Sequence, residues 1–146
     1  MTNTDSLYVM ADYVFNLLTT NQGTLGLEGL FYGDQNLIPV SPIACVEPDV
    51  KNVALKGMTR EIQNEFRVYV LLYTAFVQSP DLNRRAADQL AESVGTVLNA
   101  DAQCGGLVMH SMVEEIASGY AYKSGTIHRT SRILFTARSV TRLPQS

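Results

Sequence analysis

The chain has 146 residues, of which 46% are hydrophobic and 17% charged, which indicates one soluble globular domain with a substantial core. No run approaches the roughly 18 apolar residues of a membrane helix, and the N-terminus lacks the basic start of a signal peptide, so we expect neither. The net charge of -3 argues against a general nucleic-acid binder, and the distant Cys45 and Cys104 predict two buried free thiols.

Residues 5–20 predict an amphipathic helix. Its apolar residues recur at the three-and-four spacing that places them on one face: Leu7, Met10, Ala11, Val14, Leu17 and Leu18. Thr4 or Asp5 can cap the start of this helix, and Gly23 can adopt the positive φ that ends it.

Residues 24–58 are rich in glycine and proline, which interrupt regular structure. These residues separate short apolar bursts such as LFY, LIPV and IACV. We therefore predict short strands and ordered loops that cross a surface, and no strand in the core of a sheet.

The middle of the chain predicts a strand and then a helix. Residues 60–77 alternate in polarity, with one parity that is mostly apolar: Ile62, Asn64, Phe66, Val68, Val70 and Leu72. Residues 79–101 carry a single apolar stripe, with Ser79 as N-cap and Pro80 at the first helical position, and they predict the second helix.

The last third predicts a long β-hairpin. Residues 106–125 lead to a turn around residues 123–125, and residues 126–143 return. The predicted fold is a single α+β domain over residues 1–146, with two α-helices packed on one face of an antiparallel β-sheet and an irregular loop and β segment at residues 24–58.

Charge is segregated along the chain. Residues 1–50 carry six acids and no Lys or Arg, whereas residues 123–146 carry five bases and no acids. Either the two ends neutralise each other within one molecule, or an acidic face of one subunit meets a basic face of the next.

No group of residues has the spacing of a catalytic or metal site. His110, His128, Cys104 and Asp101 lack the short fixed spacing of a structural zinc site. Glu114 and Glu115 are neighbours on a strand, so they should point to opposite faces, one toward solvent and one toward an interface. The stretch NADAQCGGLV is best explained as the corner between helix and hairpin, with Cys104 as a small buried filler. We expect no catalytic residue, cofactor or metal.

The order of elements over residues 60–143 resembles that of the tail terminator proteins of long-tailed bacteriophages and of related neck proteins. The segments that carry the resemblance are EFRVYVLLY, RRAADQLAESVGTVLNAD, GGLVMHSMVEEIASG and RSVTRLP. The resemblance implies a ring, hexameric in this family, that caps the tail tube and joins it to the head connector, with a channel for DNA. The implied partners are further copies of the chain, the tail tube protein and the connector proteins, in a virion assembled in the host cytoplasm. A long segment at residues 24–58 would then be ordered by a neighbouring subunit.

Candidate interface residues follow from strand parity and charge. Arg132, Arg138 and Arg142 share one parity of the last strand, Glu47 and Asp49 are possible counter-charges, and Phe31 and Tyr32 are possible aromatic anchors. Two alternatives stay open. One is another neck position, such as a head-completion or tail-adaptor protein in a twelvefold ring. The other is a small cytosolic enzyme or ligand-binding domain that uses His110, Cys104 and the glycine loop.

Overall fold

The computed structural model describes residues 6–36, 38, 40–55, 61–74, 80–123 and 125–142. The described helices are α1 (Leu7–Thr20), α2 (Gln22–Leu25) and α3 (Pro80–Leu98), with a 3₁₀ turn at Cys104–Gly106. The strands are β1 (Gly29–Tyr32), β2 (Ile43–Leu55), β3 (Glu61–Thr74), β4 (His110–Lys123) and β5 (Thr126–Arg142). The predicted α+β class is confirmed, and so is the long hairpin, which β4 and β5 form.

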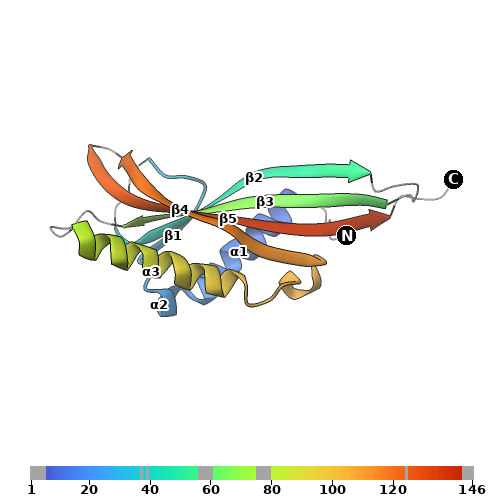
Figure 1. Cartoon of the computed structure of the whole chain (residues 1–146), viewed down its shortest axis with the longest axis horizontal. Coiled ribbons are helices and arrows are strands. Elements are labelled where there is room, and N and C mark those ends of the chain that lie inside the picture. Colours follow the sequence, from blue (N-terminus) through green and yellow to red (C-terminus); the bar gives the residue numbers. More distant parts are fainter. Residues whose placement is uncertain are drawn as a thin grey trace.

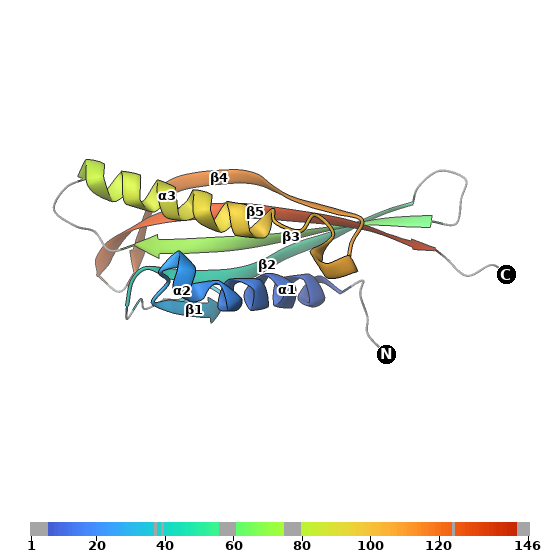
Figure 2. The same ribbon diagram turned by 90° about the horizontal axis from the view of Figure 1, so that it is seen from below.

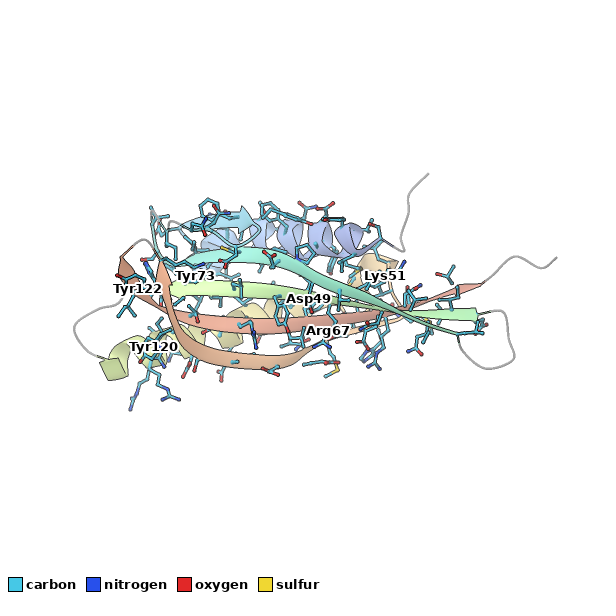
Figure 3. The ribbon with its side chains drawn as sticks, turned by 90° about the horizontal axis from the view of Figure 1, so that it is seen from above. Asp49, Lys51, Arg67, Tyr73, Tyr120 and Tyr122 are labelled. Atoms are coloured by element: carbon cyan, nitrogen blue, oxygen red, sulfur yellow. The ribbon has the colours of Figure 1, made fainter. Side chains whose placement is uncertain are left out.

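The five strands form one sheet in the order β1-β2-β3-β5-β4. The four long strands are antiparallel to their neighbours, but β1 runs parallel to β2, so the sheet is mixed where an antiparallel one was predicted. Helices α1 and α3 lie on one face of the sheet, as predicted (Figures 1 and 2). Figure 3 looks onto the opposite face, which we call the open face.

The core lies between the helices and alternate residues of the central strands. In β3 the buried side chains are Asn64, Phe66, Val68, Val70 and Leu72, the parity that the sequence predicts, together with Tyr73. On the helix side these residues pack with Met10, Val14 and Leu18 of α1 and with Ala91, Val94 and Leu98 of α3. Full burial of each large apolar side chain contributes about 1.5–3 kcal/mol, so this layer supplies most of the driving force for folding.

Helix α1 ends at Thr20, as predicted, but it begins two residues later and has other caps than predicted. Its N-cap is Ser6, whose side chain accepts a hydrogen bond from the backbone N–H of Tyr8. Thr4 and Asp5, the predicted caps, lie outside the described residues. After α1 the chain continues into the short α2, and the left-handed residue that ends the helical region is Gly26, with φ of 72°, and not Gly23.

The prediction for residues 24–58 is wrong in its main point. Strand β2 occupies thirteen of these residues and pairs with β3 along its length, and its first four side chains are fully buried. Pro48 lies where the pairing with β3 shifts register, between Pro48 and Val50. Proline has no backbone N–H to donate. It is tolerated there because it lies at a bulge, on an edge of β2 where the described residues supply no further partner strand.

One end of the sheet extends past the helices. We call this part the arm; by register it consists of residues 52–55 of β2, 61–65 of β3 and 138–142 of β5 (Figures 1 and 2). The Asn64 side chain donates hydrogen bonds to the hydroxyls of Ser139 and Thr141, which joins β3 to β5 within the arm. Val53 and Leu55 are 58% and 68% exposed, so the arm presents apolar side chains that its own helices do not cover.

Gly95 offers a test of how α3 packs. It lies in the helix, and a Cβ built at this position would be 3.5 Å from Cδ1 of Ile116, an ordinary contact distance. We expect Gly95→Ala to raise the free energy of unfolding by about 0.5–1 kcal/mol, because alanine loses less backbone entropy in a helix than glycine. Urea unfolding followed by circular dichroism measures this change. Gly106→Ala is the matched control and should destabilise the protein, because Gly106 has a φ of 91°.

Candidate assembly surface

The predicted arginines lie on the open face of the sheet. Register places Arg132 opposite Leu71, and Arg138 opposite Glu65, both on the parity that points away from the helices. The Arg132 guanidinium lies 5.0 Å from the centre of the Tyr69 ring. Arg142 pairs with Glu61 through its backbone, and its side chain lies outside the described residues.

The charges on the open face have partners within the chain. Arg138 contacts Glu65 at 3.2 Å, and Arg67 lies 3.9 Å from Asp49 (Figure 3). These pairs are partly exposed, so each contributes little to stability. Asp49, a predicted counter-charge for another subunit, is thus beside an arginine of its own chain.

Phe31 and Tyr32 do not form one aromatic anchor. Because they are neighbours on β1, they point to opposite faces of the sheet. Phe31 packs on the open face in a cluster with Ile43, Cys45 and Tyr73. Tyr32 lies on the helix side with its ring 5.8 Å from that of Phe15. Burial, followed by the nearby Asp12, raises the pKa of Tyr32 to about 12.

Asp34 ties three strands together at one end of the open face. Its carboxylate accepts a hydrogen bond of 2.6 Å from the hydroxyl of Tyr73 and one of 3.0 Å from the ammonium of Lys123. Its backbone N–H donates to the carboxylate of Glu47 at 2.8 Å. We call these four residues the latch. Sequence reasoning missed the latch, because nothing local to Asp34 indicates that it meets β3 and the end of β4.

The latch shifts the pKa values of its members. Burial raises the pKa of Asp34, but the hydrogen bonds from Tyr73 and Lys123 outweigh it, so that the pKa lies below its ordinary value. The pKa of Tyr73 is raised, first by burial and then by its bond to Asp34. Asp34 is therefore an anion that joins Lys123, from the basic C-terminal part, to the acidic N-terminal part of one chain. For this pair, therefore, the acidic N-terminal part and the basic C-terminal part neutralise each other within one molecule.

Residues 99–109 form the corner between α3 and the hairpin, as predicted. Asp101 accepts hydrogen bonds from the backbone N–H groups of Gln103 and Gly105, which lower its pKa. Cys104 is fully buried, and its thiol lies 3.3 Å from the hydroxyl of Ser111. Both cysteines are free and buried, which confirms that prediction, and burial raises the pKa of Cys45 to about 11.

The two histidines do not come together. The hairpin register places His128 beside Ala121, eleven positions along β4 from His110, and a strand rises about 3.3 Å per residue. Among the described residues, no group of three or more His, Cys, Asp and Glu side chains is placed to hold a metal ion.

Glu114 and Glu115 both contribute to the lining of one groove, and the register places Glu115 opposite Leu134, on the parity that points away from the helices. A register shift between Val113 and Glu115 breaks the alternation of β4, and both carboxylates are exposed. The groove has a volume of about 570 Å³ and runs between α3 and β4, with Glu92 on its other side. At the start of the groove the backbone N–H of Val113 donates to the side chain of Asn99 at 2.9 Å.

No helix in the described part of the chain is both long and apolar enough to cross a membrane. No family model matches the chain, and no curated protein matches it either.

The latch predicts how stability depends on pH. Because the pKa of folded Asp34 is lowered, its carboxylate stabilises the folded state above the ordinary pKa, and this contribution is lost as the pH falls through the folded-state value. We expect Asp34→Asn to lower the free energy of unfolding by about 1 kcal/mol at neutral pH, and by progressively less below about pH 4. Urea unfolding at several pH values measures both effects.

Asp88→Asn is the control for this experiment. Asp88 pairs with Arg84 at 3.7 Å on the exposed side of α3, so its substitution should change the free energy of unfolding by only a few tenths of a kcal/mol. An equal cost of Asp34→Asn at pH 3 and pH 7 would contradict the assignment of Asp34 as the ionised centre of the latch.

Proposed function

We propose that the chain is a structural virion protein of the bacteriophage neck, a tail terminator that assembles into a hexameric ring. The ring caps the completed tail tube and joins it to the head connector, and DNA passes through its central channel. The proposal takes the position in the neck and the symmetry from the resemblance over residues 60–143. It assigns no catalytic residue and no cofactor.

The arm is the observation that carries self-assembly. A three-stranded extension beyond the helices leaves Val53 and Leu55 exposed, and none of the described helices lies beneath them. Exposed apolar side chains gathered on a projecting sheet are typical of protein contacts.

The mass of the assembled protein tests the proposal. We expect native mass spectrometry and light scattering of the purified full chain to find a species of six times the 16.1 kDa chain mass. A twelvefold species would instead favour another neck component, such as a head-completion or tail-adaptor protein. A strict monomer, at high concentration and also with tail tube and connector proteins present, would contradict ring assembly.

A further inference from the structure

Two strands of the sheet have long edges without a partner strand among the described residues. Strand β4 is the last strand on one side. On the other side β1 pairs only with residues 43–46 of β2, so the rest of β2 has a free edge. Free edges present unpaired backbone N–H and C=O groups, which readily pair with another chain.

The two free edges are eight residues long on β4 and six on β2. On β4 the backbone N–H of Val113 is already bound by Asn99, so the free edge begins after the register shift and covers residues 115–122. On β2 it follows the shift at Pro48 and covers residues 50–55. Each is long enough for an ordinary strand pair.

Strand direction allows the two edges to join between copies. Strands β2 and β4 run in opposite directions, because three successive antiparallel pairings separate them. When a second copy continues the sheet, its β4 therefore lies antiparallel to β2 of the first. In this arrangement the Lys123 end of β4 in one copy lies near Val50 of the other copy. The contact therefore ends before residues 43–46 of β2, which already pair with β1.

The side chains on the two edges also match by face. Val53 and Leu55 point to the helix side of the sheet, because they pair with Asn64 and Ile62 of β3. Ile116 and Tyr122 point to the same side of β4 and are 44% and 72% exposed. When the sheet continues from one copy to the next, the helix sides of both copies lie on the same face. Val53 and Leu55 of one copy then lie beside Ile116 and Tyr122 of its neighbour.

The charges do not select this register by themselves: with the Lys123 end of β4 toward Val50, the two glutamates of β4 lie toward Leu55 and not beside Lys51. Residues 111–122 of β4 include Glu114 and Glu115 and no base, and Glu92 of α3 lies beside them in the groove. Residues 50–55 of β2 include Lys51 and no acid. Lys51 shares the helix side with Phe66, over whose ring its ammonium lies at 5.7 Å.

We propose that residues 50–55 of one copy pair with residues 115–122 of the next, so that the arm adds a strand to the open edge of its neighbour. This inference rests on the proposed function and names the contact that builds its ring. The contact joins two different surfaces of the same chain, so it is repeated from copy to copy until the ring closes. The helix α3 and groove of one copy then lie beneath the arm of the other.

Leu55→Asp tests the contact in the full chain. It places a carboxylate beside the acidic groove of the neighbour, and its own side chain is exposed, so the fold should be kept, as circular dichroism can check. We expect at least a tenfold loss of association in light scattering at matched concentration. Tyr8→Asp is the control: Tyr8 is 63% exposed, lies on α1 and should leave assembly unchanged.

Hydrogen exchange provides a second, independent measurement. In the assembled wild type, amides of residues 50–55 and 115–122 should exchange at least tenfold more slowly than in Leu55→Asp. A Leu55→Asp variant that assembles like the wild type, with no such protection in either protein, would overturn this contact and leave ring assembly standing. A wild type that stays monomeric under all conditions would overturn the proposed function together with the contact.

Discussion

Helices α1 and α3 pack against only one face of the sheet, and the rest of the structure depends on this one-sided packing. Alternate residues of β3 must enter the core, and those between them must face outward. The pairing of Val70 with Ile133 and of Val68 with Phe135 extends this alternation to β5. A slip of one residue would place Arg132 in the core, where an unpaired charge is very costly, so the register is strongly fixed.

The parts of the fold that depend on local pattern could be predicted from the sequence. The periodicity of residues 7–20, the alternation around Val68 and the turn near Gly125 each act over a few residues. The length of strand β2 was not predicted, because proline usually interrupts a strand. Pro48 does not interrupt β2, since it lies at a register shift and on an edge of the sheet. The parallel pairing of β1 was missed for a related reason, since parallel neighbours leave no turn signal in the sequence.

The candidate surface was predicted only in part, because it depends on contacts between distant segments. Parity alone placed Arg132 and Arg138 on one face correctly. Parity is interrupted in β4 only at Glu114, where the register shift of that strand falls. The bond between Tyr73 and Asp34 joins residues 39 positions apart, so no local rule could have identified it. The charges on the open face are mostly paired within the chain. The strand edges and the arm are therefore the surfaces left to contact another copy of the chain.

The sheet order has a consequence for how the chain folds. Two pairs of strands, β2 with β3 and β4 with β5, join neighbours in the sequence and close short loops. The central pairing of β3 with β5 joins the two halves across more than fifty intervening residues, from Thr74 to Thr126. Loop-closure entropy makes that joining the slow step, and until it occurs both hairpins expose the apolar faces that later form the core. The β3–β5 pairing is therefore the point at which aggregation competes most directly with folding.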